Sequence, residues 1–392
     1  MESLTDSLRY PIVPDSRHAA SLDPLHFDDV LPAVWKMNAA SDVKALVRLL
    51  HSLLPTDGFA SEMSSAACVA AMRDLGVLLG SIKRCGVEPV VAVPEAEAAL
   101  LELGARTEMK PRDTIFHYIG WNPTGARERM YTGDRMESSL ISSVRITLPR
   151  LVSAVDECRR LMELEPGEPE FALVANEMVA LIRSLEDSID IVVGNVTPEF
   201  FAQTMRPYFE AIRVGGVDYL GPAAAHVPLH LVDLALWASD NGADAYTDFW
   251  RESAQFSLPP WLPLLERWPH RASVATLVTS ALAVLPEGPV PPHLRASAES
   301  LCRALRALVV FRAKHLTVAR QAYDDEIRLH ELGSGGGSVQ LLEEVTSLVR
   351  ANASSLRSSI ASAHDGGTVL VKAGAARDRS SAADGSEGGA AL

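Results

Sequence analysis

The feature that most constrains the fold of this chain is a helical spacing of apolar residues, which recurs along most of its 392 residues. The longest uninterrupted run covers residues 293–323, and its apolar side chains stay on one face throughout. Alternation typical of strands is limited to residues 90–93 and 189–193. The sequence therefore predicts an all-α, multi-helical fold. The other runs with a helical period are residues 29–54, 63–80, 95–104, 136–164, 171–191, 198–212, 223–237 and 339–363.

Stretches rich in proline and glycine indicate how these helices are grouped. Such stretches cover residues 110–133, 213–222 and 285–292, and they favour turns and connections over helices. Glycine, serine, alanine and charged residues dominate from Asp365 to the last residue, a composition typical of disorder. The sequence thus predicts four parts, namely an N-terminal arm (1–25), a small helical domain (26–115), a large helical domain (116–364) and a disordered tail (365–392).

Charge and hydropathy exclude some partners. The net charge of −14 opposes binding to nucleic acid, because phosphate contacts require clustered lysine and arginine. No run of roughly eighteen uninterrupted apolar residues indicates a membrane span. The first residues lack the basic and apolar regions of a secretory signal. We therefore expect a cytoplasmic protein that binds neither nucleic acid nor a membrane.

Common catalytic and metal-binding motifs are missing from the sequence. It contains no GxSxG, HExxH or GxxxxGK motif and no GxGxxG after a strand, which removes the usual hydrolases, metalloproteases and nucleotide-binding enzymes. The four cysteines form no CxxC, CxxCH or zinc-binding pattern, so we expect reduced thiols. They are Cys68, Cys85, Cys158 and Cys302.

His315 is the candidate ligand on the longest helix. Its neighbours at helical spacing are apolar, so the imidazole lies in the apolar stripe. A neutral imidazole on a rigid apolar helix suits an axial iron ligand, although a hydrogen-bonded core histidine would show the same pattern. Five basic residues beside the stripe could pair with haem propionates or could simply form the solvated face. They are Arg303, Arg306, Arg312, Lys314 and Arg320.

Three further segments allow two interpretations each. Residues 333–338 (GSGGGS) are either a flexible linker or a loop whose amides and Ser334 hydroxyl bind a carboxylate. Arg213 and Tyr219, beside glycines, either face a ligand or mark a helix corner. Arg206 binds an anion or is paired on the surface. His226 and His230 also lie in an apolar helical context, as candidates after His315.

Several segments are notable together for their order and spacing, namely MRDLGVLLGSIKR (72–84), WNPT (121–124) followed by YTG (131–133), IRVGGVDYLGP (212–222), FRAKHL with Tyr323 eight residues after His315, and GSGG (333–336). In register, they resemble the monodechloroaminopyrrolnitrin synthases, haem enzymes within the indoleamine/tryptophan 2,3-dioxygenase superfamily. The resemblance runs from about Arg17 to about Ala363, nearly the whole chain. Residues 324–331 and the tail after Asp365 depart from it.

The resemblance implies an enzyme with an indoleamine 2,3-dioxygenase-like fold, in which the large domain binds haem. It implies haem b on His315, which we expect to be non-covalent because no cysteine motif for attachment occurs. It assigns Tyr323 and Ser334 to substrate binding and catalysis, near the amino-acid end of a tryptophan. No cysteine closely follows His315, which disfavours the superfamily branch of tyrosine hydroxylases with covalently linked haem.

The implied reaction is an oxidative rearrangement of tryptophan or 7-chlorotryptophan to an aminophenylpyrrole, as in pyrrolnitrin biosynthesis, with O2 or peroxide as oxidant. The substrate amine would attack C2 of the indole, and ring opening and loss of the carboxylate would follow. Plain 2,3-dioxygenation or monooxygenation of a related aromatic amino acid is the alternative within the superfamily. A helical binding protein without cofactor is the alternative of another class. We expect a monomer or homodimer.

Overall fold

The computed structural model describes residues 15–54, 58–222, 227–286 and 288–380, with side chains as far as Ala363. Within those residues the regular secondary structure is helical apart from one short hairpin, which confirms the predicted all-α fold. The two short runs with strand-like alternation form no strands: residues 90–92 lie in α6 (Pro89–Ala92), which ends before Val93, and residues 189–193 lie inside α9 (Pro169–Asn195).

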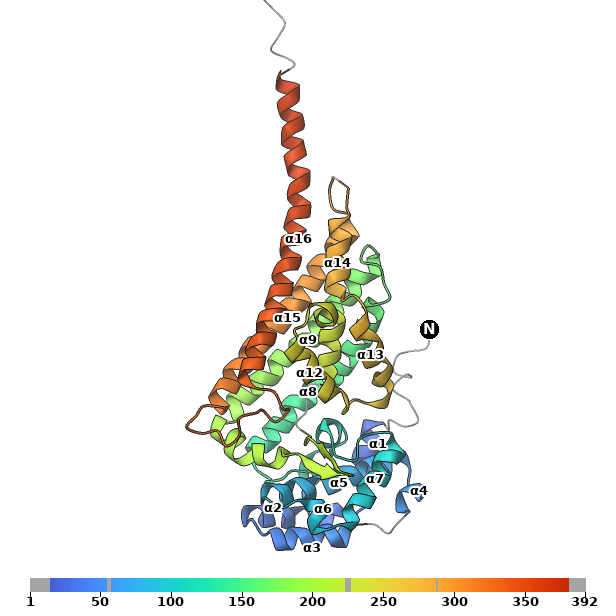
Figure 1. Cartoon of the computed structure of the whole chain (residues 1–392), viewed down its shortest axis with the longest axis vertical. Helices are drawn as coiled ribbons and strands as arrows, with labels where there is room; N and C mark the ends of the chain where they lie inside the picture. The colour runs from blue at the N-terminus through green and yellow to red at the C-terminus, as the bar shows by residue number, and fades with distance from the viewer. Residues whose placement is uncertain (1–14, 55–57, 223–226, 287, 381–392) are drawn as a thin grey trace, which may run out of the picture.

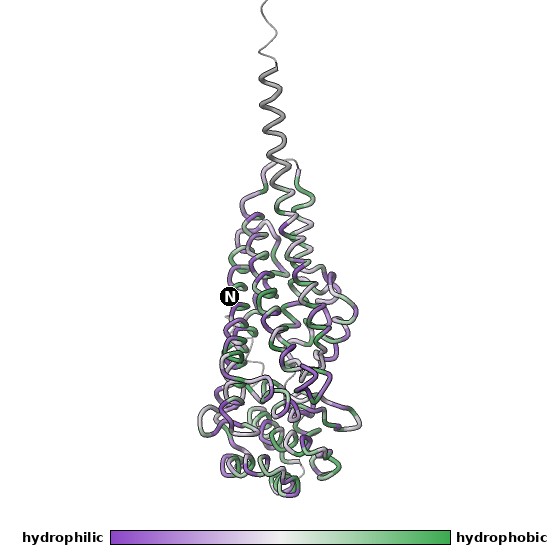
Figure 2. The backbone as a smooth tube through the Cα atoms, turned by 90° about the vertical axis from the view of Figure 1, so that its left-hand side faces the viewer, coloured by the Kyte–Doolittle hydropathy of each residue, from purple (hydrophilic) through white to green (hydrophobic). Residues whose placement is uncertain are grey.

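The molecule is elongated, with a bundle of long helices above a smaller group of helices (Figure 1). In the bundle, α9 packs between α8 and α15, and α16 packs along α15. Helices α10, α12 and α14 cover this bundle. The colouring of Figure 2 shows polar and apolar residues mixed along each helix, as expected for amphipathic helices that bury one face. The bundle helices are α8 (Arg135–Leu161), α10 (Val227–Asp233), α11 (Ser239–Asn241), α12 (Asp244–Ala254), α13 (Leu262–Arg267), α14 (Val274–Ala283), α15 (Pro292–Ala322) and α16 (Val339–Ser380).

The smaller group is built around α5 (Ser65–Arg84), whose residues from Cys68 to Ile82 are all buried. This helix is long and apolar enough to cross a membrane. However, 89% of its most apolar 18-residue stretch is buried inside the fold, which is the environment of a core helix. The other helices here are α1 (Ser16–Ser21), α2 (Leu31–Ala39), α3 (Val43–Leu53), α4 (Phe59–Glu62) and α7 (Glu95–Thr107).

Local signals explain where helices begin. The helical run predicted over residues 29–54 is two helices, because the Asp42 side chain accepts a hydrogen bond from Ala45 N and starts α3 afresh. Ser64 caps α5 through Ala67 N, and Asp134 caps α8 through Met136 N. A carboxylate or hydroxyl at each start satisfies an amide that the helix cannot.

The turn-rich stretch after α7 is a folded, buried connection. It contains a π-helix, η2 (Phe116–Gly120), and a short 3₁₀ turn, η3 (Gly125–Arg127). The Asn122 amide donates to Tyr118 O and Arg129 O and accepts from Arg129 N, so one side chain closes the loop. These bonds explain why a segment without helical periodicity is nevertheless ordered against the core.

The helix predicted over residues 198–212 ends at Phe209 and is mostly not a regular α-helix. The structure has a π-helix, η4 (Phe200–Met205), a 3₁₀ turn, η5 (Arg206–Phe209), and a hairpin of β1 (Ile212–Val214) and β2 (Val217–Tyr219). Gly215 and Gly216 both have positive φ, which a two-residue hairpin turn of this kind requires. Paired glycines between β-branched residues were the signal for this hairpin.

The C-terminal end also differs from expectation. The backbone of α16 continues past Asp365 to Ser380 as a helix that extends beyond the bundle (Figure 1), where a disordered tail was predicted. Gly366 and Gly367 are weak helix formers, but the alanine- and arginine-containing residues after them favour a helix. Residues 381–392 lie outside the described residues, as does His226.

Candidate active site

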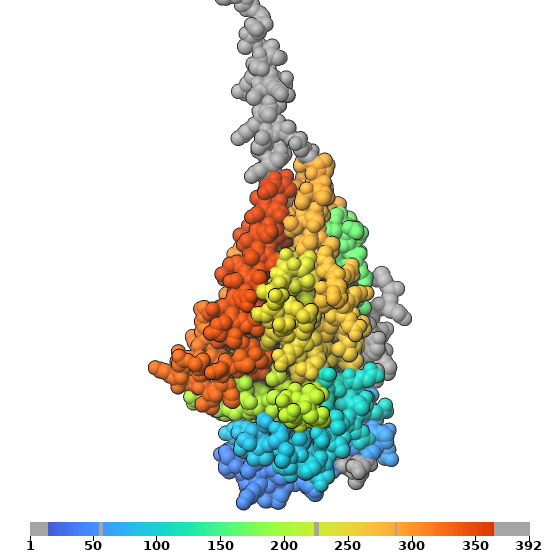
Figure 3. Space-filling model, viewed as in Figure 1, coloured from blue at the N-terminus to red at the C-terminus, as the bar shows by residue number. Residues whose placement is uncertain are grey.

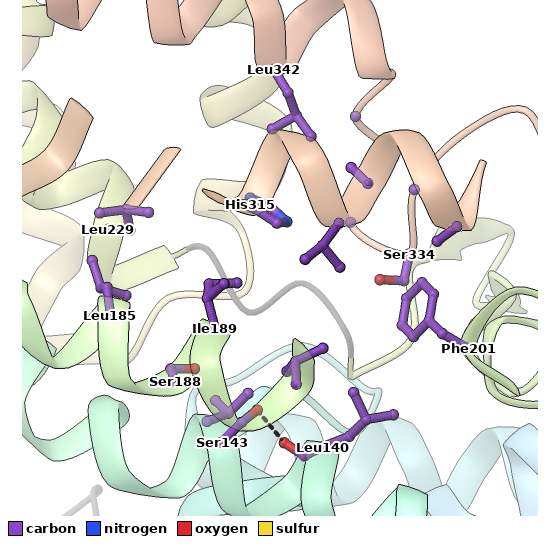
Figure 4. Close-up of a pocket in the computed structure, with 18 of the residues that line it drawn as sticks. Leu140, Ser143, Leu185, Ser188, Ile189, Phe201, Leu229, His315, Ser334 and Leu342 are labelled. Carbon is purple, nitrogen blue, oxygen red and sulfur yellow. Dashed lines mark hydrogen bonds between the residues drawn. The ribbon is translucent and has the colours of Figure 1, made fainter. Parts of the chain in front are cut away.

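A cavity of about 350 Å³ lies within the bundle, between α8, α9, α10, α12, α15 and the start of α16. Its size falls in the range of small-molecule sites, roughly 300–1,000 Å³. His315, Tyr323 and Ser334 all line it, so the structure brings the three predicted site residues together. Figure 4 shows His315 above Ile189 and Ser188, with Ser334 and Phe201 at one side. The aliphatic and aromatic walls include Leu140, Val144, Leu148, Leu185, Val192, Phe209, Leu229, Phe249 and Leu342.

His315 is held on α15 by an apolar stripe. The Phe311 ring, one turn earlier, stacks on the imidazole with centroids 5.6 Å apart and an interplanar angle of 17°. Val318, Ala319 and Ala322 line the cavity from the same helix. The residues at helical spacing around His315 therefore line a cavity and are not packed in a solid core.

Of the five basic residues beside this stripe, the structure turns Arg312 towards the cavity. Lys314 pairs with Asp190 at 2.7 Å, and Arg320 pairs with Glu343 at 2.7 Å, both on the surface. Arg303 donates to Asn176, and Arg306 is exposed. The solvated-face interpretation therefore holds for those four residues.

Arg312 belongs to a buried polar network centred on Asp233. The carboxylate of Asp233 accepts hydrogen bonds from Arg312, from Trp237 Nε1 at 2.8 Å and from Tyr246 Oη at 2.5 Å. Burial raises the pKa of Asp233, and its three donors oppose this rise. His230 Nδ1 lies 3.1 Å from Tyr246 Oη, and His230 and Tyr246 both line the cavity. A charged network thus borders the cavity one turn of α15 before His315.

Tyr323 and Ser334 form a second polar region, beyond the other side of His315 on α15. Tyr323 follows the last residue of α15, and within the described residues no group makes a hydrogen bond of ordinary distance and angle with its buried Oη, although the Arg206 guanidinium and the Ser334 backbone lie near it. Burial raises the pKa of Tyr323, and the nearby Arg206 guanidinium and the Ser334 backbone partly oppose this rise. Both hydroxyls are therefore placed where a ligand in the cavity can reach them.

The GSGGGS segment is a folded loop on the cavity wall. Gly333 N donates to Gly337 O at 2.8 Å, and Gly336 N donates to Gly333 O at 2.9 Å. Gly336 has a φ of 84°, a conformation that favours glycine. Ser338 Oγ then accepts from Leu341 N and starts α16. The segment is therefore a folded loop rather than an extended linker, and its binding of a carboxylate stays a prediction.

Arg206, Arg213 and Tyr219 are outside the cavity lining. Arg206 is paired with Glu210, as the second interpretation predicts, but it is buried rather than on the surface. Arg213 is exposed on the hairpin and donates to Gly216 O. The glycines beside Arg213 form the turn of a β-hairpin, so the helix corner that was the alternative to a ligand site is wrong as well.

Hydroxyl groups opposite His315 were missed by the sequence reasoning. Ser143 on α8 and Ser188 on α9 line the cavity (Figure 4), and Thr147 on α8 also lines it. Thr147 Oγ1 and Ser184 Oγ bond to each other at 2.9 Å, whereas Ser188 Oγ makes no hydrogen bond with the described residues. The signal was available, because Ser143 and Thr147, like Ser184 and Ser188, lie four residues apart within apolar helix faces.

Comparison with known families places this cavity in context. Residues 21–373 match the family model described as monodechloroaminopyrrolnitrin synthase PrnB. The chain belongs to the monodechloroaminopyrrolnitrin synthase family. The match includes every residue that lines the cavity, and it confirms the resemblance found in the sequence. Membership identifies the chain as an enzyme of tryptophan-derived antibiotic metabolism that acts on a small molecule.

Proposed function

We propose that this synthase-family enzyme uses haem b to rearrange tryptophan or 7-chlorotryptophan oxidatively into an aminophenylpyrrole, with His315 as the protein ligand of the iron. The observation that carries this proposal is that His315, Tyr323 and Ser334 line one apolar cavity. A planar aromatic amino acid has an apolar body and a polar end, and the cavity offers apolar walls and two hydroxyls.

The residues around the cavity fit a haem. Within the described residues no group of three metal-ligating side chains occurs, so an iron at His315 would take its remaining ligands from a macrocycle. Arg312 Nε is buried, lacks a hydrogen-bond partner among the described residues and belongs to a cavity-lining side chain. It would suit an anionic propionate. The four cysteines are outside the cavity lining, which supports non-covalent binding.

The protein's contribution is orientation. Bound haem would supply the oxidising chemistry towards the indole, with O2 or peroxide. The Tyr323 and Ser334 hydroxyls would hold the carboxylate and amine of the substrate, while the ring lies between the apolar side chains of α8 and α9. The position of the amine decides whether it can reach C2 of the indole, so these hydroxyls would decide between rearrangement and plain dioxygenation.

The test is the absorption spectrum of haem-supplemented protein, followed by titration with tryptophan derivatives and mass analysis of the products. We expect a Soret band, a shift of that band with tryptophan or 7-chlorotryptophan, and a product that has lost the carboxylate. A product that gains two oxygens and keeps its carboxylate would replace rearrangement by dioxygenation. Absence of a Soret band would favour a binding protein without cofactor.

A further inference from the structure

Arg206 lies behind the cavity wall, where it contacts the loop that carries Ser334. It is the first residue of η5 and is 9% exposed. Its Nε donates to Leu332 O at 3.2 Å, and its Nη1 pairs with Glu210 Oε1 at 2.5 Å. Leu332 is two residues before Ser334, so this bond joins the loop to the η4–η5 segment next to the proposed substrate contact.

The loop's own hydrogen bonds do not fix its place on the molecule. The bonds of Gly333 and Gly336 run within residues 333–337 and define only the shape of the turn. Besides Arg206, Gln203 Nε2 donates to Ile327 O at 3.1 Å, and His330 Nδ1 lies 3.3 Å from Glu210 Oε1. Figure 3 shows this orange segment projecting from the molecule directly above the yellow-green η4–η5 segment. Of these three contacts, the hydrogen bond from Arg206 to Leu332 O lies closest in sequence to Ser334.

The same guanidinium lies beside the second proposed substrate contact. It is close enough to Tyr323 Oη to lower the pKa of that hydroxyl against the effect of burial. A β-carbon built on Gly333 would lie 3.7 Å from Tyr323 Oη, so the tyrosine hydroxyl also adjoins the loop. The buried Arg206 guanidinium therefore contacts the carbonyl of Leu332 in the loop and also lies near the Tyr323 hydroxyl.

We propose that Arg206 is a positioning residue, which holds the loop of residues 332–338 and the Tyr323 hydroxyl in the arrangement that receives the amino-acid end of the substrate. It does not line the cavity and acts through Ser334 and Tyr323. The inference rests on the proposed function for the identity of the ligand. The ordering of the loop by Arg206 rests only on the contacts described above.

The first experiment compares the full-length parent with Arg206→Gln. We expect faster amide hydrogen exchange in residues 332–338 and a dissociation constant for L-tryptophan, from the Soret shift, that rises about tenfold or more. The Soret band without tryptophan should match the parent's, because Arg206 lies outside the cavity lining. Arg320→Gln is the matched control, since it removes a surface ion pair from the same end of α15 and should change neither readout.

A double-mutant cycle separates positioning from a general structural role. If Arg206 acts through the loop, Arg206→Gln should weaken tryptophan binding less in a Ser334→Ala background than in the parent. Equal losses in both backgrounds would overturn the proposal. Glu210→Gln, which keeps the guanidinium on Leu332 O but removes its charge partner, should give a smaller loss in the same direction. This second variant serves if Arg206→Gln melts too low to measure.

Failure of this inference is distinguishable from failure of the proposed function. A parent protein that binds no aromatic amino acid would overturn the proposed function, and hydrogen exchange would then decide the role of Arg206. Unchanged hydrogen exchange of residues 332–338 in Arg206→Gln would overturn the positioning role of Arg206, whether or not the parent protein binds an aromatic amino acid.

Discussion

Along α15, His315 lies between two polar regions of different chemistry. Before it, Arg312 and Asp233 form a buried ion pair, which presents permanent charge at the cavity border. After it, Tyr323 and Ser334 present neutral hydroxyls. A guanidinium suits an anionic group of a cofactor, whereas hydroxyls can both donate to a carboxylate and accept from an amine. The cavity thus offers a charged contact for a cofactor on one side of His315 and neutral hydroxyls for a substrate on the other.

His315→Ala is expected to fold and to bind little haem, because the alanine has no iron ligand and leaves the apolar stripe intact. Circular dichroism should show the parent's helix content, and the Soret absorbance per protein should fall strongly. Exogenous imidazole should restore part of that absorbance, since the shortened side chain leaves space for it. Haem content equal to the parent's would remove His315 from the site and direct attention to His230, which lines the same cavity.

Ser334→Ala tests the loop as part of the substrate site. Loss of a hydrogen bond to a charged carboxylate costs about 1.5–3 kcal/mol, which corresponds to roughly ten- to a hundredfold weaker binding. The Soret shift should therefore require correspondingly more tryptophan, while the spectrum without tryptophan stays like the parent's. If the variant binds tryptophan as tightly as the parent does, Ser334 makes no contact with the substrate.

At the scale of elements, close approach between segments depends on small residues in α5. A β-carbon built on Gly76 would lie 2.3 Å from Asp113 Cγ, and one on Gly80 would lie 2.8 Å from Tyr208 O. These two glycines, one turn apart, let the connection after α7 and the η5 segment pack directly on the helix. The contact matters for the site because η5 also carries Arg206.

Gly76→Ala is expected to destabilise the fold even though alanine favours helices. The added methyl group overlaps Asp113, which is itself buried in an ion pair with Arg112, so the free energy of unfolding should fall by about 1–3 kcal/mol. Urea denaturation followed by circular dichroism would measure this loss. Gly167→Ala is the control, because a β-carbon there meets no atom within 4 Å. An equal effect of the two substitutions would show that the contact with Asp113 does not matter.

At the scale of the whole molecule, buried charges around α5 join the N-terminal helices to the connection that leads to the bundle. Arg73 donates to Ala19 O at 3.2 Å and to Trp121 O at 3.0 Å, and Arg129 Nε donates to Asp74 Oδ1 at 2.8 Å. Such groups are costly to bury unless every partner is in place, so they link distant segments into one cooperative unit.

The pH dependence of the free energy of unfolding should contain a contribution from the buried His117. Burial and the charges of Arg73 and Arg112 lower the pKa of His117 to about 3, whereas the ordinary value is 6.5. Between these values the unfolded chain binds a proton that the folded chain does not, so His117 lowers the free energy of unfolding as pH falls from 6.5 towards 3. His117→Gln should reduce that decline by up to about 1.4 kcal/mol per pH unit.

Denaturation at several pH values, with parent and variant side by side, would measure this difference. Asp113 and Glu137 have raised pKa values and act in the opposite direction, but both proteins contain them, so the comparison isolates His117. Parallel stability curves for the two proteins would show that His117 does not stay neutral in the fold.

The sequence by itself determined the helices and the face on which most residues lie. Helical spacing within residues 293–323 was sufficient to put His315 in an apolar stripe, because neighbours at that spacing depend only on the local backbone. Motifs in register along the chain were sufficient for the family, which the match over residues 21–373 confirmed. Local signals that were present but overlooked, such as Gly215 and Gly216, account for the missed hairpin.

Tertiary structure alone decided which neighbour covers each face. Five basic residues flank the stripe of α15, but only the packing of α10 against the bundle pairs Arg312 with Asp233 beside the cavity. Likewise, only the fold of η4 and η5 puts Arg206 behind Ser334, more than a hundred residues later in the chain. The physical reason is that helical periodicity sets directions around one axis, whereas a site requires the relative positions of several axes, which depend on close packing of distant side chains.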